Sequence, residues 1–324
     1  MSSRIAAIDA ALDPRIARDR DVAASGLCTW RVGGPIALLV RPADTEELLA
    51  LAHVLPDDVP TLVIGRGSNL LVADRGFDGV GIVLGRGFEA LTGPGLDTAA
   101  PPGTTTLVTS GAAAALPVLA RRTAAAGLTG LEFFVGIPGS VGGAVRMNAG
   151  GHGRTTADVL VDATVVDLRA ATVTVRRSVE LDFTYRHSAI GPRDVVVGAT
   201  WSAQHGAVDE TTARIDEIVA WRREHQPGGA NAGSVFTNPV DDSAGRLIEA
   251  AGLKGMRVGG AYVSDKHANF IQAEAGASAG DVAELIDTIA AAVAGATGVE
   301  LHTEVQMVGF AGPHPRRTGS EMGS

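Results

Sequence analysis

Two glycine-rich loops constrain the fold of this chain more strongly than any other feature of its sequence. The compact β-type run Thr61-Leu-Val-Ile64 ends in Gly65-Arg-Gly-Ser-Asn69, and a second loop reads Gly136-Ile-Pro-Gly-Ser-Val-Gly-Gly143. Because glycine lacks a Cβ atom, such loops let the backbone approach a flat or phosphorylated ligand closely. The chain has 42 glycines in 324 residues, about twice the usual ~7%. The pattern indicates a sheet protein whose loops bind a large cofactor.

The first loop matches neither of the common nucleotide-binding fingerprints. Leu70 stands where the dinucleotide fingerprint needs its third glycine, and no long helix follows directly. The Gly-Lys-Ser/Thr triplet of a Walker loop does not occur in the sequence. The side-chain donors Ser68 and Asn69 still suit a tight turn that presents N–H groups to an anion. Taken alone, the loop is equally compatible with a structural turn.

Charge and cysteine content argue against several classes of function. The formal net charge is -9 and no block of Lys and Arg occurs, so a nucleic-acid partner is not expected. Cys28 is the single cysteine, which rules out an intrachain disulfide and a cysteine-built zinc site, and we expect no metal. The sequence shows no secretory signal pattern and no run of ~18 apolar residues. We therefore expect a cytoplasmic protein without a membrane span.

Hydrophobic runs and breakers divide the chain into three parts. Residues 1–24 alternate Ala with charges and predict a short helix, and Asp44 predicts the cap of the next helix. A stretch rich in Gly, Pro and Thr at 93–106 marks a boundary. Farther on, Ser278 predicts the cap of a long helix, and 299–308 predicts a final strand. The predicted divisions are 1–92, 93–205 and 206–312, with a flexible tail at 313–324.

Eight segments in order resemble the signature blocks of the UDP-N-acetylenolpyruvoylglucosamine reductase (MurB) family. They are Thr29-Trp-Arg-Val-Gly-Gly-Pro35, Gly65-Arg-Gly-Ser-Asn-Leu-Leu-Val-Ala-Asp74, Gly130-Leu-Glu-Phe-Phe-Val-Gly-Ile-Pro-Gly-Ser-Val-Gly-Gly143, Tyr185-Arg-His-Ser188, Asn231-Ala-Gly-Ser-Val-Phe-Thr-Asn-Pro239, Ala250-Ala-Gly-Leu-Lys-Gly255, Lys266-His-Ala-Asn-Phe270 and Gly298-Val-Glu-Leu-His-Thr-Glu304. Any one block is a weak signal. Eight in order make chance similarity improbable.

The resemblance implies a fold, a reaction and cofactors. The fold would be α+β, with two FAD-binding subdomains of the vanillyl-alcohol-oxidase (PCMH) type and a C-terminal α+β substrate-binding domain. The implied enzyme is a UDP-N-acetylmuramate dehydrogenase of peptidoglycan precursor synthesis. It would use NADPH and non-covalently bound FAD to reduce a small-molecule substrate, UDP-N-acetylglucosamine enolpyruvate.

The resemblance also assigns roles to individual residues. Arg186 matches the family's cation, Glu304 its carboxyl partner and Ser234 its proton donor. Without the resemblance, these three would pass as a surface ion-pair residue, a solvated strand residue and a turn residue. The residues implied for FAD binding are Arg31, Gly65, Arg66, Gly67, Ser68, Asn69, Leu70, Gly136, Pro138, Gly139, Ser140, Gly142, Gly143 and Asn148. Those implied for substrate binding are Tyr185, Arg222, Asn238, Lys254, Lys266 and His267.

Three positions depart from the family pattern. Thr237 replaces a common Lys or Arg, Gln272 begins a Gln-Ala pair in place of Val-Asn, and His152 interrupts a Gly-Ala-Tyr-Gly pattern. These changes bear on substrate affinity and on the nicotinamide subsite. Two rival functions remain open: an FAD-dependent sugar or alcohol oxidase of the same superfamily, and a non-catalytic paralogue that binds flavin or a UDP-sugar.

Overall fold

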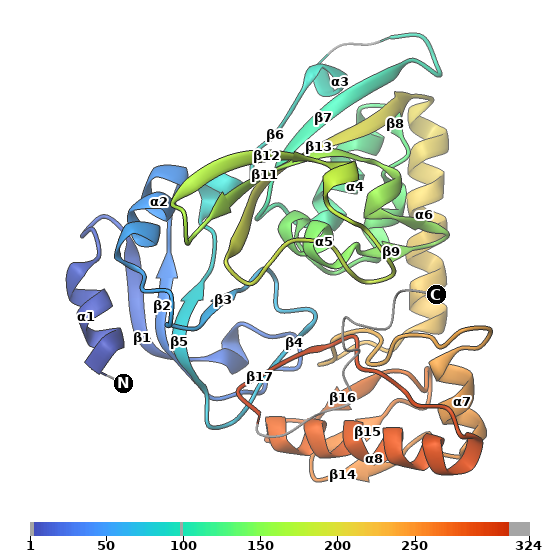
Figure 1. Ribbon diagram of the computed structural model, residues 1–324. Coiled ribbons are helices and arrows are strands. Elements are labelled where there is room, and N and C mark those ends of the chain that lie inside the picture. The colour runs from blue at the N-terminus through green and yellow to red at the C-terminus, as the bar shows by residue number, and fades with distance from the viewer. Residues whose placement is uncertain (1–2, 98–99, 311–324) are drawn as a thin grey trace. The chain divides into compact units, whose positions relative to one another are not determined.

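The computed structural model describes residues 3–97 and 100–310 (Figure 1). Of these, 3–21, 37–66 and 78–224 form a larger unit, and 22–36, 67–77 and 225–310 form a smaller unit. The predicted tail at 313–324 lies outside the described residues. No helix within the described ranges is long and apolar enough to cross a membrane.

The first sheet lies mainly in the larger unit. Its strand order is β1 (Ala17–Ala23), β2 (Pro35–Arg41), β5 (Phe77–Ile82) and β3 (Thr61–Val63), accompanied by helices α1 (Ser3–Ala11) and α2 (Thr45–Val54). The carboxylate of Asp44 accepts the Glu47 N–H at 2.9 Å, which confirms the predicted cap of α2. The helix predicted over 1–24 is wrong beyond α1. Edge strand β1 tolerates its charges, and Arg18 donates to the buried carboxylate of Asp9 at 2.7 Å.

A second, antiparallel sheet fills the rest of the larger unit. Its order is β12 (Thr172–Arg177), β11 (Leu160–Asp167), β13 (Asp194–His205), β7 (Thr105–Gly111) and β6 (Leu91–Thr92), and β8 (Leu128–Thr129) also pairs with β13. Helices α4 (Leu116–Ala125) and α5 (Val141–Met147) pack on one face, where they bury Leu119, Val145 and Trp201. The remaining elements are α3 (Pro94–Asp97), β9 (Gly150–Gly151), β10 (Arg154–Thr155), α6 (Val208–His225) and the short 3-10 helices η1 (Ala24–Gly26), η2 (Arg86–Phe88), η3 (Glu132–Gly136), η4 (Thr156–Asp158) and η5 (Ser178–Glu180).

A β-bulge in β13 redirects side chains where the candidate site lies. The pairing with β11 shifts register between Thr164 and Val165, which leaves Val197 as an extra residue. Val195 and the extra residue Val197 join the core beneath α2, whereas Val196 joins the core beneath α4 and α5. An extra residue bends the strand and shifts the alternation of its side chains. Val196 and Ala199 therefore lie in the same core, although they are three residues apart.

The smaller unit is built around a three-stranded antiparallel sheet of β14 (Arg257–Val258), β15 (Ala261–Val263) and β16 (Ile271–Ala273). Helices α7 (Ala244–Ala250) and α8 (Ala279–Thr297) belong to its core, and α8 crosses the sheet (Figure 1). Ser278 caps α8 in a capping box with Asp281, as predicted. The predicted strand over 299–308 is confined to β17 (Gln306–Val308), which pairs in parallel with β4 (Leu70–Val72).

Candidate active site

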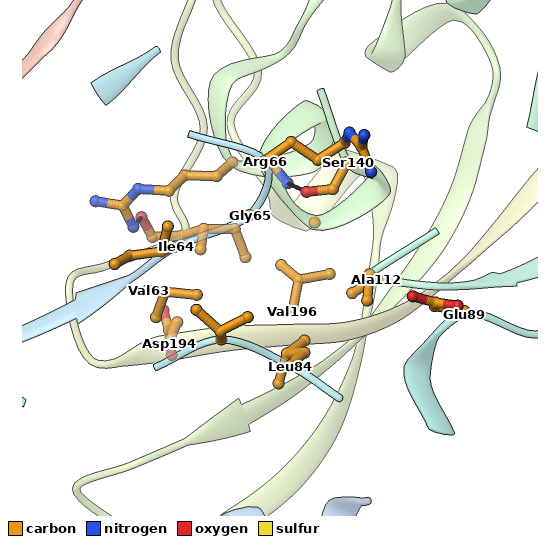
Figure 2. A pocket seen from close by; sticks show the side chains of 16 residues that line it. Val63, Ile64, Gly65, Arg66, Leu84, Glu89, Ala112, Ser140, Asp194 and Val196 are labelled. Carbon is orange, nitrogen blue, oxygen red and sulfur yellow. Dashed lines mark hydrogen bonds between the residues drawn. The ribbon is translucent and has the colours of Figure 1, made fainter. Parts of the chain in front are cut away.

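A cavity of about 230 Å³ lies within the larger unit, where the two glycine loops converge (Figure 2). The segment after β3 contributes Gly65 and Arg66, and the segment around α5 contributes Ser140, Gly142 and Gly143. Apolar side chains line the cavity from several strands and loops, and they include Val63, Ile64, Leu84 and Val196. Most of its lining is therefore apolar, with glycine backbone alongside. Such a surface suits a flat, largely apolar ring attached to a polar group.

Gly65 allows the two loops to touch. A Cβ atom at Gly65 would lie 2.4 Å from the hydroxyl oxygen of Ser140, closer than Cβ atoms approach other atoms. The Ser140 hydroxyl also accepts the Gly143 N–H at 3.4 Å, so its position is set by the start of α5. A side chain at position 65 would therefore displace the Ser140 hydroxyl from its observed position.

The second glycine loop is hydrogen-bonded to the sheet through Ala112. The Gly142 N–H donates to the Ala112 carbonyl at 2.9 Å, and the Ala112 N–H donates to the carbonyl of the bulge residue Val197 at 3.1 Å. The Gly139 carbonyl accepts the Leu116 N–H at 3.0 Å. The Gly142 amide is already engaged, and a Cβ atom here would lie 3.2 Å from the Ala112 Cβ, so glycine at this position allows the loop to pack closely on the sheet. Of the other loop residues, Gly136 is half-buried beside His152 and Pro138 is exposed.

The remaining residues of the first loop belong to the smaller unit. Gly67 has φ +61°, and a Cβ atom there would lie 1.9 Å from the Leu27 carbonyl oxygen. Ser68 is half-buried, and Leu70 is buried at the start of β4. The Asn69 side chain donates to the Glu304 carbonyl at 3.1 Å. Arg31 is exposed at φ +60°.

Two charged residues of the cavity are tied into the larger unit. Burial lowers the pKa of Arg146, whose guanidinium donates to the carbonyls of Ile190 at 2.9 Å and Gly191 at 2.7 Å. Burial opposes ionisation of Asp194, but hydrogen bonds from Arg176 and from the Gly191 N–H outweigh it and lower the pKa of Asp194. Arg176 bonds both carboxylate oxygens, at 2.8 and 2.9 Å. Both charged groups therefore brace the segment that leads into β13.

Arg186 stands at the tip of a tight turn. The N–H of Thr184 donates to the His187 carbonyl at 3.1 Å, and the His187 N–H returns a bond to the Thr184 carbonyl at 3.2 Å. Arg186 has φ +58°, a left-handed conformation that favours Gly or Asn. Its guanidinium lies 5.0 Å from the ring centroid of exposed Tyr185 and donates to the Gly150 carbonyl at 3.3 Å. A non-glycine residue in this conformation is strained, which is common at functional sites.

Side-chain hydrogen bonds fasten this turn to the segment after α5. Asn148 donates from its carboxamide to the Thr184 carbonyl at 2.9 Å and accepts the Ala157 N–H at 3.0 Å. Ser188 donates from its hydroxyl to the Arg146 carbonyl at 2.7 Å. Asn148 is buried and itself left-handed, at φ +42°. The structure thus gives Asn148, predicted as a cofactor residue, an observed role in supporting the Arg186 turn.

Ser234 and Glu304 are brought together in the smaller unit. Ser234 forms an isolated antiparallel bridge with Phe270. On the other side of the same segment, the Glu304 N–H donates to the Val235 carbonyl at 2.8 Å. Both side chains are half-buried. A hydroxyl and a carboxylate are therefore carried on neighbouring segments, although they are 70 residues apart in the sequence.

One buried side chain that the sequence did not single out holds the Ser234 segment. Asn269 is 3% exposed, and its carboxamide accepts the Phe236 N–H at 2.9 Å and donates to the Phe236 carbonyl at 2.8 Å. The backbone carbonyl of Asn269 also accepts the Val235 N–H at 2.9 Å. Its place in the block Lys266-His-Ala-Asn-Phe270 was the available signal, but only the fold shows what it touches.

The predicted substrate residues in the smaller unit have varied surroundings. Asn238 is exposed and accepts the Ala244 N–H at the start of α7, at 3.1 Å. Lys254 pairs with Glu249 at 2.7 Å, and Lys266 is exposed. Burial lowers the pKa of His267, whose ring centroid lies 4.7 Å from that of Phe270. His267 is thus the predicted substrate residue next to the partner of Ser234.

Each of the three residues that depart from the family pattern makes a local contact in the structure. The Thr237 hydroxyl donates to the His302 carbonyl at 3.2 Å, and the Gln272 amide donates to the Gly228 carbonyl at 2.9 Å. In the larger unit, the His152 ring stands edge-on to Trp221 at 5.2 Å between centroids. Next to Trp221, burial lowers the pKa of Arg222. Within the described ranges, no group of three or more His, Cys, Asp and Glu side chains is placed to hold a metal ion.

Two family models match the chain in succession. Residues 36–176 match an FAD binding domain, and residues 225–308 match the C-terminal domain of UDP-N-acetylenolpyruvoylglucosamine reductase. The first match contains the cavity residues from Val63 to Arg146, including those of both glycine loops, and the second contains the Ser234 segment and Glu304.

Relatives with the same description match nearly the whole chain. A UDP-N-acetylenolpyruvoylglucosamine reductase of Rhodopseudomonas palustris (strain BisB5) is 43% identical over 286 residues, which cover 87% of this chain and 89% of the relative. One of Heliobacterium modesticaldum is 42% identical and covers 90% of this chain and 91% of the relative. The crystal structure of UDP-N-acetylenolpyruvylglucosamine reductase (MurB) from Thermus caldophilus is 35% identical, with a TM-score of 0.77, and covers 91% of this chain and 99% of that chain. These matches confirm the predicted fold class.

Proposed function

The chain belongs to the UDP-N-acetylenolpyruvoylglucosamine reductase family, and from this premise we propose that it is a UDP-N-acetylmuramate dehydrogenase of peptidoglycan precursor synthesis. The enzyme uses NADPH and FAD to reduce the enolpyruvyl group of UDP-N-acetylglucosamine enolpyruvate. The observation that carries the proposal is the identity of 42–43% over 87–90% of the chain to proteins of that name.

The lining of the cavity in the larger unit suits parts of an FAD. Its apolar side chains suit the flat flavin ring, and the guanidinium of Arg66 and the hydroxyl of Ser140 suit a polar link such as a pyrophosphate. Gly65, Arg66, Ser140, Gly142 and Gly143 are the lining residues that we propose to hold it. When bound, FAD supplies the hydride relay between NADPH and the substrate.

Arg186, as a fixed cation, and Glu304, as a hydrogen-bonding acid, are proposed to stabilise the negative charge that develops on the substrate. The terminal carbon of an enolpyruvyl ether accepts hydride only because it is conjugated with the carboxylate, so negative charge accumulates there as an enolate. A fixed guanidinium stabilises such charge more in the transition state than in the ground state. Arg186 is suited to this role because its strained turn holds the guanidinium without requiring rearrangement at the moment of reaction.

Ser234 is proposed to donate the proton that completes the reduction. A serine hydroxyl is a weak acid, so it can serve only toward a strongly basic carbon such as that of an enolate. Glu304, on the adjacent segment, is the nearby group that we propose as its partner. The chemistry therefore depends on how the Ser234 segment is oriented more than on the intrinsic pKa of serine.

We propose a division of labour along the chain that follows the three predicted parts. Residues 1–92 and 93–205 hold FAD, and 206–312 bind the UDP-sugar. The candidate substrate contacts in 206–312 are Arg222, Asn238, Lys254, Lys266 and His267, and Tyr185 is a further candidate from 93–205. The uridine diphosphate is anionic, and three residues of this set, Arg222, Lys254 and Lys266, have cationic side chains that can bind it. A cytoplasmic location, where NADPH and sugar nucleotides are available, completes the proposal.

Anaerobic stopped-flow absorbance tests the function. The purified protein should be yellow. NADPH should bleach the flavin absorbance, and the enolpyruvyl UDP-sugar should then restore the oxidised spectrum on the timescale of turnover. An enzyme that is reoxidised rapidly by oxygen but not by the enolpyruvyl UDP-sugar would instead be an oxidase. Bound flavin without reduction by NADPH would indicate a non-catalytic paralogue.

Ser234→Ala separates the two half-reactions. We expect reduction by NADPH near the wild-type rate and reoxidation by the substrate slowed by about 10²- to 10⁴-fold, because only the second step needs the proton. Thr237→Val removes a hydroxyl from the same segment and is the matched control, with both steps unchanged. Equal loss in both half-reactions of Ser234→Ala would reject the donor role.

A further inference from the structure

The segment that carries Ser234 is not part of a continuous ladder. Its antiparallel contacts are two isolated bridges, from Ser234 to Phe270 and from Phe236 to Thr303. The consecutive N–H groups of Val235 and Phe236 both donate to Asn269, one to its backbone carbonyl and one to its side chain. In a regular strand, successive N–H groups point to opposite sides and bond to different neighbours. Regular pairing alone therefore does not set the orientation of this segment.

The Asn269 carboxamide replaces the missing strand partner. It accepts from the Phe236 N–H at 2.9 Å and donates to the Phe236 carbonyl at 2.8 Å, so it satisfies both polar groups of one buried residue. A carboxamide is the side-chain group that can do both at once, since it carries an acceptor and a donor side by side. With Asn269 3% exposed, water is not an available substitute.

We propose that Asn269 is a positioning residue for proton transfer, acting through the Phe236 peptide on the orientation of the Ser234 hydroxyl. The inference rests on the proposed function and adds a residue to it. Only Val235 separates Ser234 from Phe236, and the Val235 N–H is bonded to the Asn269 carbonyl at 2.9 Å. Rotation of the Phe236 peptide would be transmitted directly to Ser234, and through the Val235 carbonyl to Glu304. Misplacement by about 1 Å can cost about 10²-fold in rate.

The product itself reports the orientation of the proton donor. The carbon that Ser234 protonates becomes a stereocentre, because it then bears a hydrogen, a methyl group, a carboxylate and the ether oxygen. A correctly aimed hydroxyl delivers the proton to one face. A misaimed one leaves the enolate to take a proton from water on either face, so the product becomes a mixture of epimers.

The test compares Asn269→Asp with Asn231→Asp. Asn269→Asp keeps the acceptor for the Phe236 N–H but loses the donor to its carbonyl. Asn231→Asp is matched in chemistry, since its side chain also accepts from a backbone N–H, that of Gly233 at 3.0 Å, and donates to carbonyls, those of Gly228 and Gly229 at 3.2 Å. Both holoenzymes are assayed by stopped-flow absorbance for each half-reaction and by NMR for the epimer ratio of the product.

We expect Asn269→Asp to be reduced by NADPH at close to the wild-type rate, to be reoxidised by the substrate about 10- to 100-fold more slowly, and to yield both epimers. Asn231→Asp should retain both rates and a single epimer. If Asn269→Asp does not fold, Asn269→Ser, which keeps a smaller donor and acceptor, takes its place with the same expectation.

A single epimer together with an unchanged reoxidation rate in the folded Asn269 variant would overturn the proposal. So would an equal loss in both half-reactions with a single epimer, because that pattern indicates a general effect on the fold. If the wild-type enzyme is not reoxidised by the enolpyruvyl UDP-sugar, it is the proposed function that fails.

Discussion

The turn that carries Arg186 and the segment that carries Ser234 are held in place by different means. The Arg186 turn is fastened from outside by side chains, with Asn148 bonded to the Thr184 carbonyl and Ser188 to the Arg146 carbonyl. The Ser234 segment is held largely by backbone bonds on both sides, together with the carboxamide of Asn269. The Arg186 turn is also strained, with φ +58° at the proposed catalytic residue.

Because of this difference, substitutions should affect the two regions in different ways. Backbone bonds survive most substitutions, whereas a turn fastened by side chains loses its supports one residue at a time. The strain at Arg186 is tolerated because the surrounding bonds determine the conformation, a common arrangement at functional sites. Substitutions should therefore separate activity from stability in the Arg186 turn more readily than in the Ser234 segment.

Arg186→Gly should have the largest effect on activity of the substitutions in the Arg186 turn. Loss of the cation should slow reoxidation by the substrate by about 10²- to 10³-fold. The free energy of unfolding should stay level or rise by up to about 1 kcal/mol, because glycine adopts φ +58° without strain. Stopped-flow absorbance and chemical denaturation measure the two effects.

Ala171→Gly is the control for Arg186→Gly. Ala171 is also left-handed, at φ +51°, in the connection between β11 and β12. We expect a similar relief of strain with unchanged activity. A marked loss of stability in Arg186→Gly alone would mean that the Arg186 side chain supports the turn, contrary to the comparison.

Substitution of Asn148 should show how far the Arg186 turn depends on side-chain hydrogen bonds. Asn148→Gly and Asn148→Ala both lose the bonds to Thr184 and Ala157, at a cost of about 2 kcal/mol in the free energy of unfolding. Asn148→Ala should cost about 1 kcal/mol more, since alanine is strained at φ +42°. Both should slow reoxidation by the substrate while the bound FAD, measured by absorbance, stays near wild type. Loss of FAD from both variants would instead favour a direct cofactor contact.

Asp194→Asn should reveal a pH-dependent support of the same region. The pKa of Asp194 in the folded protein is below the ordinary 3.8, so its ionised form stabilises the fold above that pH and the benefit disappears as the pH falls through the lowered value. At pH 7 the substitution should cost about 1–3 kcal/mol, since the bonds to Arg176 are charge-assisted. Denaturation curves of both proteins should converge at acidic pH. A difference that does not change with pH would contradict the assignment.

Thr237→Val should have the smallest effect. It tests whether the Ser234 segment depends less on side-chain bonds than the Arg186 turn does. It removes the hydroxyl bond to His302, while the backbone N–H of Thr237 still donates to the same carbonyl at 2.9 Å. The free energy of unfolding should fall by no more than about 1 kcal/mol, at every pH, and both half-reactions should be unchanged. A large loss would show that the Ser234 segment depends on side chains as much as the Arg186 turn does.

Features that depend on residues close together in the chain could be predicted from the sequence. Asp44 and Ser278 cap their helices with bonds that span three residues, so their types and spacing predict them. The glycine loops and the ordered blocks likewise identified the family and the FAD-binding and C-terminal domains. Sequence patterns overextended the first helix and the last strand, because whether a charged segment becomes an edge strand depends on partners elsewhere in the chain.

The residues that hold the proposed catalytic residues in place could be identified only from the tertiary structure. Asn148 and Thr184 are 36 residues apart, and Asn269 and Phe236 are 33 apart. No local pattern distinguishes an asparagine that binds a distant backbone from one that binds a ligand, since both use the same carboxamide. The left-handed backbone of Arg186 is also imposed by distant contacts against its own preference. The sequence determines which groups are present, and long-range hydrogen bonds determine how they are oriented.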